Sequence, residues 1–122
     1  MCGITCVLGK GDIYSHVLNS FYQLQNRGYD SAGISIFDGS IKTHKYASNN
    51  QESALDKLKK HSSSSNIGLG HTRWATHGAK SDINSHPHHS FNDKFTLVHN
   101  GIIENFEELK KYLVENNISR NK

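Results

Sequence analysis

A turn signal between two strand-like runs is the feature that most constrains this chain. Asp38-Gly39 separates residues 31–37 from residues 41–46. Asp-Gly favours the tight turn that joins two antiparallel strands. The sequence therefore predicts a β-hairpin over residues 31–46, and a fold that contains antiparallel pairing.

Local periodicity predicts the other elements. Apolar residues recur at helical spacing between Ile13 and Leu24, which indicates an amphipathic helix. A second helix, short and polar, is expected over residues 52–60. Residues 2–8 form a strand-like run that we interpret as buried, and two further strand-like runs cover residues 67–72 and 95–98. Within 122 residues this pattern predicts one small α+β domain.

The last predicted helix has its own start signal. Asn105 is a common N-cap residue, and Glu108 follows three residues later, as in a capping box. One face of this helix is apolar and carries Phe106, Leu109, Tyr112 and Leu113.

Charge and composition exclude several classes of protein. The net charge is +3 and the lysines are scattered, whereas a nucleic-acid-binding surface needs a basic stripe. No stretch resembles a secretory signal or a membrane span, so no membrane partner is expected. Two cysteines in such a chain fit a reducing compartment, and the predicted location is the cytoplasm.

Cys2 is a candidate nucleophile because it directly follows the initiator Met1. Removal of Met1 would give Cys2 a free α-amino group, which titrates near pH ~8 and can accept the thiol proton. Such a residue unites nucleophile and base, as acyl transfer requires. The alternative is that a cysteine at position 2 has no function. Cys6 would lie on the same side of a strand, and we expect it to be a buried core thiol.

Three further residues suit acyl transfer. Asn100 and Gly101 follow the strand-like run 95–98 and offer an amide and an open backbone N–H to an oxyanion. Arg73 lies in a loop rich in Gly, His and Ser that is expected over residues 73–90, and a guanidinium can bind a carboxylate with two hydrogen bonds. The alternatives are an ordinary Asn-Gly turn and a solvated arginine.

The histidines invite a metal hypothesis. The chain has nine, and His86, His88 and His89 are clustered. Their spacing matches no established zinc pattern, and no acidic residue is interleaved. We therefore predict no metal site.

Several longer blocks, taken together, resemble one family. In order they are Met1-Cys2-Gly3-Ile4, Arg27-Gly28-Tyr29-Asp30-Ser31-Ala32-Gly33-Ile34, Gly70-His71-Thr72-Arg73-Trp74-Ala75-Thr76-His77-Gly78, Asn84-Ser85-His86-Pro87-His88 and Val98-His99-Asn100-Gly101-Ile102-Ile103-Glu104-Asn105-Phe106. The series closely resembles the glutaminase domain of the glucosamine-6-phosphate synthases, which are class II glutamine amidotransferases. The resemblance covers nearly all of residues 1–113.

The resemblance implies an N-terminal nucleophile fold, an αββα sandwich of two sheets between helices. It implies hydrolysis of the L-glutamine side-chain amide through a Cys2 thioester, with Asn100 and Gly101 as the oxyanion hole. It implies no metal or organic cofactor. Substrate binding would fall to Arg73, Trp74, Thr76 and His77, with Arg27 supporting the site.

One departure from the family pattern shapes the last expectation. In the family, a Thr-Asp-Thr-Glu segment follows the last helix and holds the glutamine α-amino group, whereas this chain reads Asn116 to Lys122 at that point. Residues 1–122 are therefore expected to be a partial amidotransferase domain, incomplete on its C-terminal side. A separate chain would then supply the missing half or the sugar-isomerase domains. The alternative is an inactive remnant that binds another protein.

Overall fold

Four antiparallel strands form the main sheet of the computed structural model, which describes residues 2–24, 30–74 and 80–118. The elements are β1 (Gly3–Leu8), α1 (Ile13–Leu24), β2 (Ser31–Phe37), β3 (Ile41–Ala47), α2 (Ala54–Leu58), β4 (Ile67–Arg73), β5 (His88–His89), β6 (Thr96–Leu97) and α3 (Phe106–Glu115). The strand order is β1-β4-β2-β3, and β5 pairs with β6 separately. The predicted α+β class is confirmed.

The predicted hairpin is present, because β2 and β3 pair in antiparallel register from Ser31↔Ala47 to Phe37↔Ile41. β4 lies between β1 and β2 and is antiparallel to both. The start of β1 therefore lies beside the end of β4, with Gly3 opposite Thr72. This register brings the N-terminal residues to the segment that follows β4.

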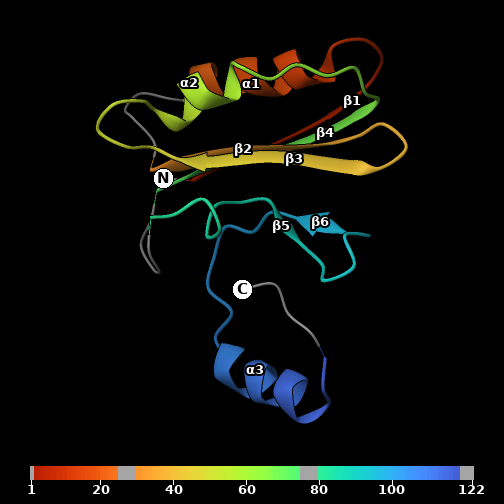
Figure 1. Cartoon of the computed structure of the whole chain (residues 1–122), viewed down its shortest axis with the longest axis vertical. Helices are drawn as coiled ribbons and strands as arrows, with labels where there is room; N and C mark the ends of the chain where they lie inside the picture. Colours follow the sequence, from red (N-terminus) through yellow and green to blue (C-terminus); the bar gives the residue numbers. More distant parts are fainter. Residues whose placement is uncertain (1, 25–29, 75–79, 119–122) are drawn as a thin grey trace.

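The core lies between the sheet and the helices α1 and α2, which cover one sheet face (Figure 1). The predicted helix over residues 13–24 is confirmed. The Tyr14 hydroxyl joins the two helices by donating to the Leu58 carbonyl at 2.7 Å. A Cβ at Gly70 would lie 2.4 Å from a Val17 methyl, so the absent side chain lets α1 rest directly on β4. The buried apolar residues are Ile13, Tyr14, Val17, Leu18, Phe21, Ala32, Ile34, Ile36, Ala54, Leu55 and Leu58.

The opposite sheet face is covered only in part, by the segment that carries β5 and β6 (Figure 1). Lys45 donates to the Pro87 carbonyl at 3.1 Å, and the hydroxyls of Ser35 and Thr96 lie 3.1 Å apart. β1 lies at the edge of the sheet, and its side chains alternate between half-buried and exposed. The prediction of a buried strand over residues 2–8 is therefore wrong: none of these residues is buried, and Ile4, Cys6 and Leu8 are exposed.

Cys6 belongs to the exposed half of β1, and the prediction of a core thiol is wrong. Cys2 and Cys6 are four residues apart and share a face of the strand, as alternation predicts. That face, however, is the one that α1 does not cover. Side-chain polarity alone could not reveal which face of the strand the helix would select.

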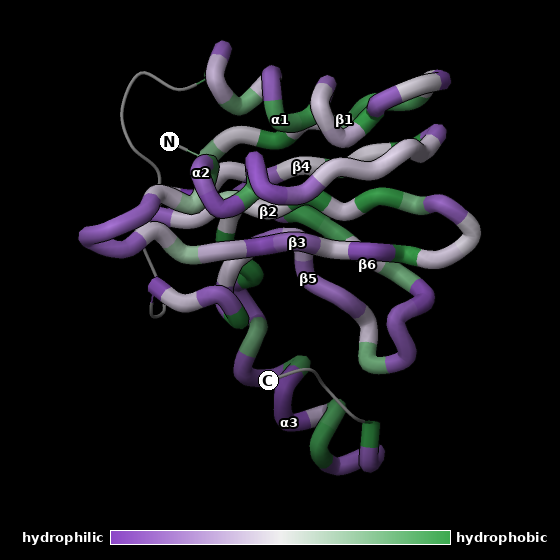
Figure 2. The backbone as a smooth tube through the Cα atoms, turned by 45° about the horizontal axis from the view of Figure 1, so that its top comes forward, coloured by the Kyte–Doolittle hydropathy of each residue, from purple (hydrophilic) through white to green (hydrophobic). Residues whose placement is uncertain are grey.

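α3 begins after Asn105, as predicted, but without a capping box. The Asn105 side chain makes no capping hydrogen bond, and its backbone ψ of 31° lies outside the extended region that an N-cap residue uses. None of the ten residues of α3 is buried. Figure 1 places the helix apart from the sheet, and Figure 2 colours it with both hydrophobic and hydrophilic stretches.

Other predicted boundaries shift. The helix expected over residues 52–60 is shorter and is not purely polar, because Ala54, Leu55 and Leu58 are buried. The loop expected over residues 73–90 contains β5, and the strand expected over 95–98 is limited to Thr96–Leu97. In the described part of the chain, the helices are too short or too polar to cross a lipid bilayer.

Candidate functional site

The Cys2 thiol lies against the backbone that follows β4. The Trp74 N–H donates to Cys2 Sγ at 3.3 Å, and Sγ lies 3.6 Å from the Trp74 carbonyl oxygen. The antiparallel register of β1 and β4 makes this contact between residues far apart in the sequence. Cys2 is partly exposed, so its sulfur is accessible to a small substrate and already has one backbone donor.

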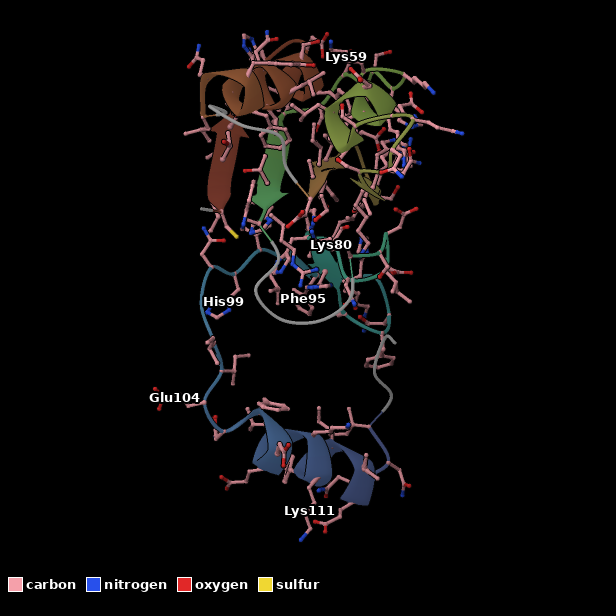
Figure 3. All side chains as sticks on the ribbon, turned by 90° about the vertical axis from the view of Figure 1, so that its left-hand side faces the viewer. Lys59, Lys80, Phe95, His99, Glu104 and Lys111 are labelled. Carbon is pink, nitrogen blue, oxygen red and sulfur yellow. The ribbon has the colours of Figure 1, made fainter. Side chains whose placement is uncertain are left out.

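Asn100 contacts the backbone of Cys2. Its Nδ2 donates to the Cys2 carbonyl oxygen at 3.1 Å, and its Oδ1 lies 2.7 Å from His71 Nε2. The segment that carries it leads from β6 to α3, and Figure 3 shows its neighbours His99 and Glu104 along this connection. The amide of Asn100 therefore lies within hydrogen-bonding distance of the Cys2 backbone.

Gly101 has a backbone conformation that suits only glycine. Its φ is +151°, and a Cβ built there would lie 3.1 Å from two atoms of the His99 ring. A side chain would strain the backbone and push against His99. The residue following Asn100 therefore presents an uncovered backbone, as an oxyanion-binding N–H requires.

Arg73 ends β4 on the same sheet face as His71, two residues earlier. Its Nη1 donates to the Asn84 carbonyl at 3.1 Å, which ties the half-buried side chain to the segment before β5. Trp74 follows with 44% of its surface exposed. The structure thus brings Cys2 into contact with Trp74 and Asn100, and Arg73 precedes Trp74 at the end of β4.

Three residues predicted for the site lie outside the described residues: Arg27, Thr76 and His77. The residues on either side of segment 75–79 are held to the sheet. Trp74 contacts Cys2, and the Lys80 ammonium, labelled in Figure 3, pairs with Asp30 Oδ1 at 2.9 Å. Asp30 also donates its N–H to the Arg73 carbonyl at 3.1 Å.

A stack of imidazole rings underlies the site. The ring centroids of His71 and His86 are 4.2 Å apart, and these two rings are nearly parallel. The His88 ring is tilted against that of His86, with the two centroids 4.3 Å apart. Gly33 allows this stack, because a Cβ there would lie only 2.1 Å from the His86 carbonyl oxygen. In the sequence, His86 and His88 stood out as candidate metal ligands, whereas His71 was given no role in the site. The alternation along residues 67–73 already put His71 and Arg73 on one face, and this signal could have drawn His71 into the site.

Burial lowers the pKa of several imidazoles in the folded chain. For His86 the pKa falls to about 3, because burial disfavours the imidazolium and the charges of His71, His88, Arg73 and Lys45 add to the effect. Burial likewise lowers the pKa of His71 and His88, and the Arg73 cation contributes to both shifts. The stack is therefore neutral near pH 7.

We expect the free energy of unfolding to fall as pH decreases from about 6.5. Unfolded histidines bind protons near pH ~6.5, whereas His86 in the folded chain resists protonation until about pH 3. The unfolded state therefore binds more protons within this window, and acid favours it. Thermal unfolding between pH 7 and pH 4.5 measures the effect. His86→Phe keeps a ring on His71 but cannot titrate, so it should flatten the dependence by up to one proton. A flat wild-type profile would contradict the low pKa of the stack.

An open groove of about 520 Å³ lies between the β5–β6 segment and the start of α3. Its walls include His86, His99, Gly101, Ile103 and Phe106.

Within residues 2–24, 30–74 and 80–118, no three His, Cys, Asp or Glu side chains are arranged to hold a metal ion.

Sequence comparison identifies close relatives of the chain. No family model matches it. It is 43% identical over 116 residues to the glutamine–fructose-6-phosphate aminotransferases (isomerizing) of Geobacillus kaustophilus and Shouchella clausii, and 44% identical over 114 residues to that of Clostridium acetobutylicum. These matches cover 93–94% of this chain. The chain spans only about 19% of the length of each relative.

Proposed function

By its sequence the chain belongs with the glutamine–fructose-6-phosphate aminotransferases, and from that premise we propose that it carries their glutamine-hydrolysing site. The observation that best supports this function is the meeting of three groups at one point. They are the Cys2 sulfur, the Trp74 N–H at 3.3 Å from it, and the Asn100 amide at 3.1 Å from the Cys2 carbonyl. A nucleophile beside neutral donors is what acyl transfer needs.

The proposed reaction starts after Met1 has been removed. The α-amino group of Cys2 accepts the thiol proton, and the sulfur attacks the side-chain amide carbon of glutamine. The oxygen of the tetrahedral intermediate accepts hydrogen bonds from the Asn100 amide and the Gly101 N–H. The protonated amine then gives its proton to the leaving nitrogen, and ammonia departs as the C–N bond breaks. Water attacks the Cys2 thioester, the C–S bond breaks, and glutamate is released.

Substrate binding is assigned to the segment after β4. Arg73 would bind the α-carboxylate of glutamine, and Trp74, Thr76 and His77 would enclose the substrate. Arg27 would support the site beside Cys2. Every group in this mechanism comes from the chain, from glutamine or from water, so the proposal includes no metal or organic cofactor. Nucleic acid and membrane have no part in the proposal, and the chain would act in the cytoplasm.

We expect Arg73→Lys to raise the KM for glutamine by roughly ten- to a hundredfold, with a smaller effect on kcat. Lysine cannot bind a carboxylate with two parallel hydrogen bonds, and a lost charge-assisted contact is worth about 1.5–3 kcal/mol. Steady-state glutaminase kinetics measure the change. Lys80→Arg, outside the proposed substrate contacts, serves as a matched charge-preserving control. An effect of Arg73→Lys confined to kcat would assign Arg73 to the transition state instead.

We further propose that residues 1–122 are part of an N-terminal nucleophile domain whose second sheet comes from additional polypeptide. The support is physical: the sheet face opposite α1 exposes Ile4, Leu8, Phe37 and Ile67, and α3 buries none of its residues. Uncovered apolar faces of this kind favour contact with further protein. The covering polypeptide, whether in the same or a separate chain, would also supply a carboxylate for the glutamine α-amino group.

A second candidate is a non-catalytic module that binds another protein. The observation that favours it is again α3, where Phe106 is 55% exposed, Tyr112 is 59% exposed and no residue is buried. An inactive module has no chemical need for Cys2, Arg73 and Asn100 together. The glutaminase reading therefore accounts for more of the site.

Glutamate release by the purified chain tests the proposed function. The chain is incubated with L-glutamine, glutamate and ammonia are quantified, and intact mass reports whether Met1 has been lost. We expect equal amounts of both products and none from Cys2→Ala. If the mass has Cys2 at the N-terminus and the chain still releases no glutamate, the non-catalytic module becomes the better reading.

A further inference from the structure

The orientation of the Asn100 amide decides whether it can stabilise an oxyanion. A carboxamide has a donor end and an acceptor end, and only the NH₂ end stabilises negative charge. In the structure Nδ2 points to the Cys2 carbonyl at 3.1 Å, while Oδ1 points to His71 Nε2 at 2.7 Å. The hydrogen-bonding partners at the two ends must therefore select this orientation over the flipped one.

His71 is well placed to make that selection. It lies within β4, opposite Ile4 on one side and Gly33 on the other, and only 1% of its surface is exposed. The His86 ring stacks on it at 4.2 Å. A ring fixed by a strand and a stacked neighbour cannot turn away from Asn100 without disrupting both contacts.

The hydrogen-bonding partners of His71 indicate which of its ring nitrogens carries the proton. Among the described residues, no group lies within hydrogen-bonding distance of the buried His71 Nδ1. A proton on Nδ1 would leave a buried donor unsatisfied, which costs about 1–3 kcal/mol. A proton on Nε2 instead donates to Asn100 Oδ1. The Nε2–H tautomer therefore satisfies the donor and fixes Oδ1 toward His71.

The flipped amide is disfavoured at its other end as well. Turning Asn100 over would place Oδ1 near the Cys2 carbonyl oxygen, where the two acceptors repel. It would also present Nδ2 to the Nε2–H of His71, where two donors meet. Both ends thus favour the same orientation, with the NH₂ group toward Cys2.

We propose that His71 is a positioning residue for glutamine hydrolysis: its Nε2–H holds Asn100 Oδ1 and thereby directs the Asn100 NH₂ group toward the oxyanion formed at Cys2. The proposal rests on the glutaminase function set out above. Burial lowers the pKa of His71, which agrees with a neutral ring that has a single donor nitrogen at pH 7. His71 does not touch the reacting atoms and acts only through Asn100.

The tautomer can be measured directly on the full ¹⁵N-labelled chain. Long-range ¹H–¹⁵N correlation of the imidazole distinguishes the protonated ring nitrogen from the bare one. We expect the His71 proton on Nε2 at pH 7. A proton on Nδ1 would overturn the proposal whatever the enzymatic activity. This measurement also separates the two ideas, because it holds for a chain that turns over no glutamine.

Kinetics test the consequence. His71→Leu should lower kcat by about 10²-fold, the loss expected for one oxyanion donor, and leave the KM for glutamine nearly unchanged. His71→Gln should restore most of the activity, because its amide nitrogen can donate from the position of Nε2. Thermal unfolding of both variants reports any loss of structure.

A double-mutant cycle separates positioning from a structural role. In an Asn100→Ala background, His71→Leu should cause no further fall in kcat, because His71 acts only on the amide that is already gone. A further fall of similar size would overturn the proposal. If the unsubstituted chain releases no glutamate, the proposed function fails, and the imidazole spectrum alone decides how Asn100 is held.

Discussion

Replacing Cys2 with alanine should reduce glutamine hydrolysis to the uncatalysed background, because no other group in the proposed mechanism can form the thioester. Cys6→Ala should leave the rate unchanged. Both thiols lie on β1, and Cys6 is the more exposed of the two. Only Cys2 receives the Trp74 N–H at 3.3 Å, and only Cys2 can carry a free α-amino group. Glutamate release by the variants measures both effects.

A labelling experiment controls for simple thiol exposure. A glutamine-analogue electrophile should modify Cys2, whereas a neutral alkylating reagent of similar size should modify Cys6 as well. Peptide mapping by mass spectrometry locates each label. Equal modification of both cysteines by the glutamine analogue would mean that accessibility, and not a built site, governs reactivity at Cys2. The same spectra report whether Met1 has been removed before reaction.

The elements of the fold were predictable where local signals and tertiary packing agree. Asp38-Gly39 correctly indicated the hairpin of β2 and β3, and helical spacing correctly indicated α1. The prediction of a capping box at Asn105 is wrong, because a sequence pattern does not fix the backbone angles that an N-cap residue requires. The prediction that Cys6 is buried is wrong, because β1 is an edge strand and the order of strands in a sheet depends on contacts between distant residues.

The candidate site was predictable in composition and not in geometry. Residue type and motif pointed to Cys2, Arg73 and Asn100 as candidates, and in the structure Asn100 contacts the Cys2 backbone. Sequence alone could not give the contacts among them, since the register of β1 on β4 joins residues far apart in the chain. The role proposed for His71 depends on one hydrogen bond, between its Nε2 and Asn100 Oδ1, and no local pattern encodes such a bond.

The isolated chain should self-associate through the sheet face that α1 does not cover. Register places Leu8 opposite Ile67, and Ile67 opposite Phe37, so these side chains form one row across three neighbouring strands. Their exposed fractions are 73%, 43% and 47%. An uninterrupted apolar row beside the unpaired edge of β1 favours contact between copies.

Lysine substitutions on this row should break the association. Burying each of these side chains against a second copy is worth about 1 kcal/mol, roughly half of full burial. Leu8→Lys with Phe37→Lys removes two such contributions from each of two copies, about 4 kcal/mol, which weakens dimerisation on the order of 10³-fold. Leu24→Lys is the matched control, because Leu24 is 52% exposed but belongs to α1, on the other side of the sheet. Analytical sedimentation over a concentration series measures dimerisation of the wild-type chain, the double variant and the control. A wild-type chain that stays monomeric throughout would mean that the apolar row needs no cover, and would remove the physical support for a second sheet.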